Sequence, residues 1–214
     1  PYHALYGATT QRAVLNFSVS GKPVSRSIIY AFAMLKQAAA NANARLKLLD
    51  KERAGLIDDA CEEIMIALDD PTRSEGMMQH FPVDVYQTGS GTSTNMNVNE
   101  VISNIACKAA GSKVGSKDPV HPNDHVNMGQ SSNDTFPTAM QLAACMELRE
   151  FLLPAIKGLA KSLKAKAKKW DKIVTVGRTH LMDATPIRMG QIFSGYEAAM
   201  RYGIRRAERA MMRL

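Results

Sequence analysis

A long segment with the pattern of one continuous helix is the feature that most constrains how this chain can fold. Asn133 and Asp134 carry side chains typical of helix caps, and Pro137 follows within the first turn, where a missing N–H is harmless. The helical pattern then continues to about Lys169, which corresponds to a helix of about 50 Å. We expect a kink near Pro154, because a proline inside a helix removes a hydrogen bond. A helix of this length fits a helix bundle better than a compact globule.

Further helices are indicated before this segment. Apolar residues recur every three or four positions over residues 24–50 and 52–68, and again after the polar loop that begins at Gln87. Residues 111–123 are rich in Gly, Ser, Pro and Lys, which is typical of a connection between two parts of a protein. These patterns predict a mainly all-α chain.

The C-terminal part of the chain has a short break before a last helix. Residues 172–176 are β-prone, residues 177–185 are typical of a loop, and Pro186 suits the first turn of a helix toward Leu214. Aromatic residues are scarce at 6%, whereas Ala and Met are abundant, which favours packed helices over a β-sandwich.

Charge and hydropathy argue against several classes of protein. Residues 157–213 hold 14 Lys and Arg against four acidic residues. Because these charges recur at helical spacing without interleaved aromatic residues, we expect a solvated helix face and no nucleic-acid partner. No apolar window of about 18 residues indicates a membrane span. Cys61, Cys107 and Cys145 lack metal-ligand spacing, so we expect free thiols in a reducing compartment.

Three polar loops share one design, a cluster of hydroxyl and amide side chains directly before an expected helix. They cover residues 89–97, 129–134 and 177–186. Helix N-termini present unpaired N–H groups and a partial positive charge, and Ser, Thr and Asn add directional donors for carboxylate or phosphate oxygens. Each loop could be a simple helix cap, but three loops with more donors than a cap needs favour binding of a small anion. No phosphate-loop pattern occurs, so a nucleotide is not indicated.

Histidines add one candidate for proton transfer. His180 lies in the third polar loop, and an imidazole titrates near neutral pH, although a lone histidine is more often structural. His121 and His125 have no third ligand at zinc spacing, so a metal site is not indicated.

Four stretches of the sequence closely resemble sequence motifs of the class II fumarase/aspartase superfamily. They are TQRAVLNF (10–17), FPVDVYQTGSGTSTNMNVNEV (81–101), HPNDHVNMGQSSNDTFPTAM (121–140) and GRTHLMDATPIRMGQIFSGY (177–196). The pair Thr179-His180 and the run Ser131-Ser132-Asn133 have the form of fumarases, where aspartases tend to have Thr-Gln and Ser-Thr-Asn.

The resemblance implies a fold and an activity. It implies a helical lyase domain over residues 1–128 and the first long helices of a central bundle over residues 129–214. The implied reaction is the reversible hydration of fumarate to (S)-malate, a step of the tricarboxylic acid cycle, without a metal or an organic cofactor. The implied assembly is a homotetramer whose active sites each combine three subunits, located in the cytoplasm or, in a eukaryote, the mitochondrial matrix.

Site residues are carried over onto the matching positions. The resemblance implies that His180, from a second subunit, is catalytic and handles the water molecule. It implies that the substrate carboxylates are bound by hydroxyl and amide side chains, namely Ser90, Thr92, Ser131, Ser132, Asn133 and, from the second subunit, Thr179. An accessory dicarboxylate site of some fumarases would match His121, Asn123 and Asp124.

Two departures from the family pattern limit these expectations. The signature GSSxMPxKxN, whose serine is thought to abstract the proton, does not occur in the chain, so we expect a truncated N-terminal portion that is inactive alone. Asp118 stands where an accessory site would have an arginine. Three alternatives remain open: aspartate ammonia-lyase, another lyase of the superfamily, and an assembly fragment without catalysis.

Overall fold

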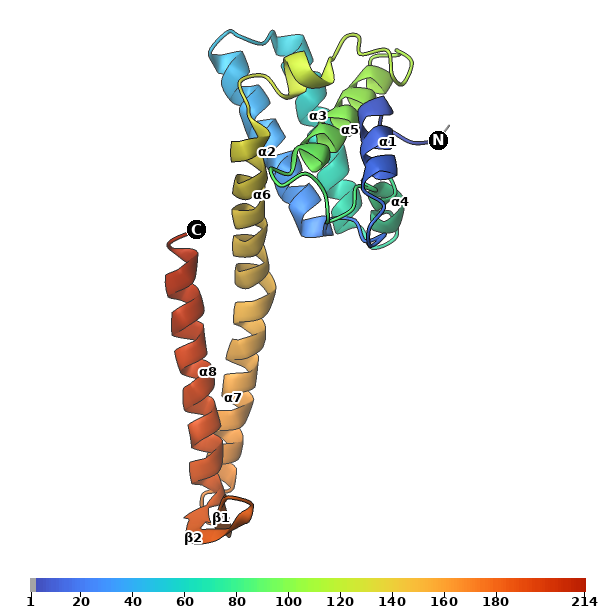
Figure 1. The fold of residues 1–214 in the computed structure, drawn as a ribbon. Coiled ribbons are helices and arrows are strands. Elements are labelled where there is room, and N and C mark those ends of the chain that lie inside the picture. The colour runs from blue at the N-terminus through green and yellow to red at the C-terminus, as the bar shows by residue number, and fades with distance from the viewer. Residues whose placement is uncertain (1–2) are drawn as a thin grey trace. The chain divides into compact units, whose positions relative to one another are not determined.

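The computed structural model describes residues 3–214, and its helices dominate (Figure 1). The fold class predicted from the sequence, mainly all-α, is therefore confirmed. The chain divides into two compact units, of which the first ends at Ala143 and the second runs over Ala144–Leu214. The first turns of α6 (Ser132–Glu147) belong to the first unit, because Ala139 and Ala143 are buried in its core. The domain boundary after residue 128 stays a prediction.

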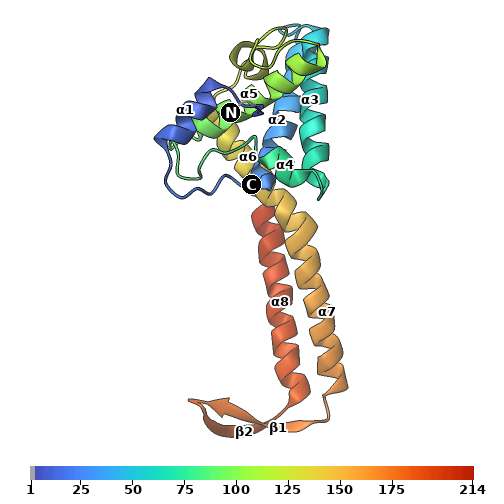
Figure 2. The same ribbon diagram turned by 90° about the vertical axis from the view of Figure 1, so that its right-hand side faces the viewer.

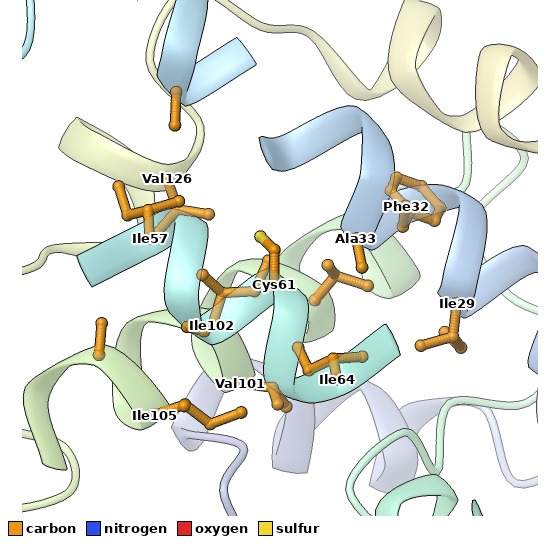
Figure 3. Close-up of a cluster of buried hydrophobic side chains, with 14 of the residues drawn as sticks. Ile29, Phe32, Ala33, Ile57, Cys61, Ile64, Val101, Ile102, Ile105 and Val126 are labelled. Atoms are coloured by element: carbon orange, nitrogen blue, oxygen red, sulfur yellow. The ribbon is translucent and has the colours of Figure 1, made fainter. Parts of the chain in front are cut away.

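The first unit is built from three long helices: α2 (Arg26–Arg45), α3 (Lys51–Asp69) and α5 (Thr92–Ala109). Their buried side chains form one cluster, shown in Figure 3, in which Phe32 of α2, Ile64 of α3 and Ile102 of α5 are fully buried. The expected helices over residues 24–50 and 52–68 and the helix after Gln87 are thus present, with ends that differ by a few residues.

Helix α5 is the centre of the first unit. Nearly every residue from Ser93 to Cys107 is buried, including several Asn and Ser side chains. Buried polar groups need partners, and many of these side chains bond to distant backbone: Asn97 donates to the carbonyl of His80, and Ser103 to that of Val120. Helix α5 thereby holds the connecting segments in place.

Helix α1 (Ala8–Asn16) was not predicted, and a carboxylate from α5 explains why it forms. The Glu100 carboxylate accepts hydrogen bonds from the backbone N–H groups of Gly7, Thr9 and Thr10 at 2.9–3.1 Å, and from the Thr10 hydroxyl at 2.6 Å. A negative charge at a helix N-terminus satisfies free N–H groups and complements the helix dipole. Two short elements complete the unit, α4 (Ser74–Met78) and the π turn η1 (Pro122–Val126).

The second unit is a helical hairpin. It contains the π turn η2 (Leu148–Leu152), α7 (Leu153–Lys169) and α8 (Met189–Met211), and Figures 1 and 2 show α7 and α8 side by side and antiparallel. Lys157 and Glu208, 3.4 Å apart, link the two helices. The irregularity expected near Pro154 takes the form of the preceding π turn, which accommodates the missing N–H.

The loop expected over residues 177–185 is wrong. The segment forms an antiparallel hairpin of β1 (Val174–Thr179) and β2 (Met182–Arg188), and Pro186 pairs with Val176 in β2 instead of opening α8. Both strands of a two-stranded sheet are edge strands, and a proline is tolerated there because no hydrogen bond of a central strand depends on its missing N–H. Within residues 3–214, no helix combines the length and the apolar character that crossing a membrane requires.

Candidate active site

The first polar loop is fixed directly before α5. Gly91 is the N-cap residue of α5 and has a left-handed backbone with φ +68°. The Gln87 side chain accepts a hydrogen bond from the backbone N–H of Thr94 at 2.9 Å and donates to the Asp84 carbonyl at 2.9 Å. The Gln87 side chain therefore connects the segment before the loop with the first turn of α5. Within the loop, the hydroxyl oxygens of Ser90 and Thr92 lie 2.9 Å apart.

The second polar loop leads into α6 in the same way. The Ser131 carbonyl accepts hydrogen bonds from the backbone N–H groups of Asp134 and Thr135 at 3.0 and 2.9 Å. The Ser131 hydroxyl accepts from the backbone N–H of Asn133 at 3.3 Å. Ser131 thus performs the capping that the sequence assigned to Asn133 and Asp134, and the helix begins at Ser132.

The two loops meet through a single hydrogen bond between side chains. The hydroxyl oxygens of Thr92 and Ser132 lie 2.8 Å apart, so Ser90, Thr92 and Ser132 form a continuous chain of hydroxyl groups. These three side chains are half-buried, while Ser131 and Asn133 are exposed. The structure therefore brings together predicted site residues of both loops at the N-termini of two helices, and helix N-termini in general favour anions.

Thr179 and His180 lie in the second unit, on the β-hairpin. Thr179 ends β1 and pairs with Met182, which leaves His180 and Leu181 as a two-residue turn. Both turn residues have left-handed backbones, with φ of +50° and +63°. Two positive φ values suit the twist of a tight hairpin. They are uncommon for residues other than Gly, although His adopts them more often than Leu does. The turn exposes the imidazole of His180 and leaves Leu181 96% exposed.

The three residues of the predicted accessory site lie together in and before π turn η1. The Nδ1 atom of His121 accepts hydrogen bonds from the backbone N–H groups of Asn123 and Asp124 at 3.3 and 3.2 Å. Because Nδ1 acts as an acceptor, its 3.3 Å approach to the Asp124 carboxylate is not an ion pair in this arrangement. His121 thus caps the turn, and the accessory site stays a prediction.

A polar network that the sequence patterns do not predict lies beside the two loops. Lys36 of α2 is fully buried, and its ammonium group contacts the side-chain oxygens of Asn95, Asn127 and Gln130. A signal existed in the sequence, because Lys36 stands four residues after Phe32 and four before Ala40, both of which are buried.

One further cluster of acidic side chains lies on α3. Within residues 3–214, the one group of His, Cys, Asp or Glu side chains with metal-ligand proximity comprises Asp58, Asp59 and Glu62 of α3. Asp58 is half-buried and the other two are exposed, and exposed acidic groups on a helix commonly hold no ion.

Comparison with known proteins identifies the class to which this fold and site belong. Residues 1–214 match the family model described as lyase, and the chain belongs to this lyase family. It is 48% identical over 217 residues to the mitochondrial fumarate hydratase of Rhizopus oryzae, an alignment that covers 100% of the chain and 42% of the relative.

Solved structures agree with the predicted superfamily fold. The chain is similar to the fumarate lyase:delta crystallin of Brucella melitensis, with 39% identity and a TM-score of 0.91, covering 99% of this chain and 48% of that one. It is also similar to the class II fumarase of Schistosoma mansoni, with 39% identity and a TM-score of 0.86, covering 95% and 41% of the two chains. The chain spans about two fifths of the length of the curated relatives it matches.

Proposed function

We propose that the natural polypeptide containing this chain adds water reversibly to fumarate to give (S)-malate. The observation that carries the proposal is the hydroxyl chain of Ser90, Thr92 and Ser132 at the N-termini of α5 and α6. Relatives named fumarate hydratase, 46–48% identical over the whole chain, support the choice of fumarate. So does Thr179-His180, which has the fumarase form rather than the aspartase form.

The proposed role of the two loops is to hold the substrate carboxylates. In the dehydration direction, a base takes the proton of the C–H bond next to one carboxylate, a step that the resemblance assigns to the serine of the GSSxMPxKxN signature. The electron pair of that bond moves into the carboxylate, which becomes a doubly charged aci-carboxylate. The C–O bond then breaks, the double bond forms, and the hydroxyl group leaves as water after it gains a proton. Ser131, Ser132 and Asn133 on one loop and Ser90 and Thr92 on the other supply fixed donors, which stabilise the developing charge without reorganisation.

Thr179 and His180 complete the proposed site from a second copy of the chain. The hairpin turn exposes His180, which suits insertion into a neighbouring subunit. In hydration, the imidazole would accept a proton from water as the oxygen attacks, and in dehydration it would return that proton to the leaving hydroxyl. The proposed assembly is a homotetramer in the cytoplasm or mitochondrial matrix, and the reaction uses neither a metal nor an organic cofactor.

The loss of fumarate's ultraviolet absorbance tests the proposal. We expect the natural polypeptide to consume fumarate, and the 214-residue chain alone to leave it unchanged, because GSSxMPxKxN is absent from the chain. Release of ammonia from aspartate without hydration of fumarate would replace this proposal with an aspartase activity.

His180→Asn tests the role of the hairpin. We expect the substitution in the natural polypeptide to lower kcat by about 100-fold or more while KM for fumarate changes by less than about threefold, because proton transfer contributes mainly to the transition state. Equal losses in kcat and in substrate affinity would contradict a proton-transfer role. Sedimentation velocity of the same sample would show whether the assembly persists.

A further inference from the structure

Lys36 is the one buried lysine of the described chain, and its surroundings are unusual. The side chain is 0% exposed, and Nζ lies 2.8 Å from Asn95 Oδ1, 2.9 Å from Asn127 Oδ1 and 2.9 Å from Gln130 Oε1. None of these three partners is charged. Lysine is almost never fully buried unless it is paired with a charge, so a buried lysine held only by amide oxygens requires an explanation.

The three acceptors match the protonated form of the lysine. An ammonium group has three N–H donors, whereas a neutral amine has two and would direct its lone pair at the third oxygen. Burial lowers the pKa of Lys36 to about 7, because an apolar environment disfavours the charged form. The three short contacts therefore fit an ammonium ion, which donates one hydrogen bond to each of the three oxygens.

The partners of Lys36 lead to both halves of the candidate site. Asn95 lies one turn after Thr92 in α5, and its Oδ1 also accepts a hydrogen bond from the Thr135 hydroxyl of α6 at 3.2 Å. Gln130 directly precedes Ser131 in the second polar loop.

Asn127 connects Asn95 with Gln130 through hydrogen bonds. Its Nδ2 donates to the Gln130 carbonyl at 3.1 Å, and its Oδ1 accepts from Asn95 at 3.1 Å. One buried cation thus joins α2, the first turns of α5 and the loop that opens α6.

We propose that Lys36 is a positioning residue of the carboxylate-binding site, whose ammonium group fixes Asn95 and the 127–130 loop so that the hydroxyls of Thr92 and Ser132 meet. The identity of the substrate in this inference rests on the proposed function. The ammonium group also places a positive charge within the protein beside a site of neutral donors, where it favours a dianion without contacting it.

Hydrogen exchange tests the positioning without any assumption about the substrate. The substitution Lys36→Met keeps the length of the aliphatic part of the side chain and removes the ammonium group. Lys51→Met, which removes one charge from an exposed lysine, is the matched control. In the 214-residue chain we expect Lys36→Met to speed hydrogen exchange by about tenfold or more, relative to the rest of the first unit, at the backbone amides of Gln130, Asp134 and Thr135. The reason is that the loop loses its hydrogen bond to the ammonium group. Unchanged amide exchange in this loop, or an equal increase of the exchange rate throughout the first unit, would overturn the proposal.

Kinetics in the natural polypeptide test the consequence for the site. We expect Lys36→Met to raise KM for fumarate by about tenfold and to lower kcat/KM by about 100-fold, because misplaced donors bind both substrate and transition state less well. A purely structural lysine would lower the amount of folded enzyme and leave KM unchanged, which would contradict the proposal. Lys51→Met should behave as the wild type.

A second variant keeps the test decisive if Lys36→Met does not fold. Gln130→Met removes one of the two Lys36 partners on the 127–130 loop, together with the hydrogen bonds that Gln130 donates to the carbonyls of Val126 and Met128. We expect the same pattern with smaller amplitude; wild-type exchange and wild-type KM in this variant would overturn the proposal. If the natural polypeptide does not hydrate fumarate, the proposed function fails, but the exchange experiment still decides whether Lys36 positions the loop.

Discussion

Replacing Gly91 with alanine should separate the two polar loops. Gly91 has a left-handed backbone with φ +68°, and an added Cβ would overlap the ring of Phe136. Phe136 lies in the first turns of α6, four residues after Ser132, and its ring packs against Phe32 with centroids 6.0 Å apart. The ring therefore has little room to move, and the strain should act on the contact between the loops.

The expected destabilisation follows from three contributions. The left-handed backbone costs an alanine roughly 1–2 kcal/mol. Displacing a packed ring costs roughly 1–3 kcal/mol. The reduced entropy of the unfolded chain offsets roughly 0.4–1 kcal/mol of this. We expect Gly91→Ala to lower the free energy of unfolding by about 3 kcal/mol, which corresponds to a Tm decrease of about 6–12 °C for a chain of this size.

Urea denaturation followed by circular dichroism measures this change, and Gly89→Ala in the same loop is the matched control. A Cβ at Gly89 meets open space, so we expect a change within about 0.5 kcal/mol. The double variant Gly91→Ala/Phe136→Ala should be less destabilised than the sum of its single variants, because the smaller side chain removes the overlap. Equal stability of Gly91→Ala and Gly89→Ala would contradict a steric overlap with Phe136.

Two further predictions concern buried carboxylates. Backbone hydrogen bonds from Tyr86, Ser20 and Gly21 lower the pKa of Asp84 from 3.8 to about 2, so the folded state holds fewer protons than the unfolded state, and stability should fall as pH drops from about 4 to about 2. Denaturation of Asp84→Asn across this window should show a flatter pH dependence and lower stability at pH 7; a slope equal to that of the wild type would contradict the assignment. Glu100→Gln replaces one acceptor oxygen with an N–H₂ donor facing the N-terminus of α1, and we expect about 2–3 kcal/mol of destabilisation with faster amide exchange at Thr10. Retained protection at Thr10 would show that the carboxylate does not hold α1.

The sequence predicted the long helices because their apolar residues repeat at helical spacing. The sequence did not predict the hairpin, because a strand forms only when a second strand pairs with it. Val176 pairs with Pro186, a residue that by itself suits the start of a helix. It also missed α1, whose N-terminus is stabilised by Glu100 from a helix about 90 residues away. Such contacts between distant segments leave no local pattern.

The candidate site was predicted in part. The resemblance named the residues of both loops, but the contact between the hydroxyls of Thr92 and Ser132 joins positions 40 residues apart and follows only from the packing of α5 and α6. Lys36 was overlooked because lysine is usually exposed, although its place between Phe32 and Ala40 on the buried face of α2 indicated otherwise.

We propose that the hydroxyl chain at the N-termini of α5 and α6 binds the carboxylates of the substrate, and the variant Thr92→Val tests this role. Valine keeps the shape of threonine and removes the hydroxyl that contacts Ser90 and Ser132. Thr138→Val, at an exposed position of α6, is the control. We predict that kcat/KM for fumarate in the natural polypeptide falls by about 100- to 1,000-fold in Thr92→Val and stays unchanged in Thr138→Val. Fumarate hydration within about threefold of the wild type in Thr92→Val would contradict the claim.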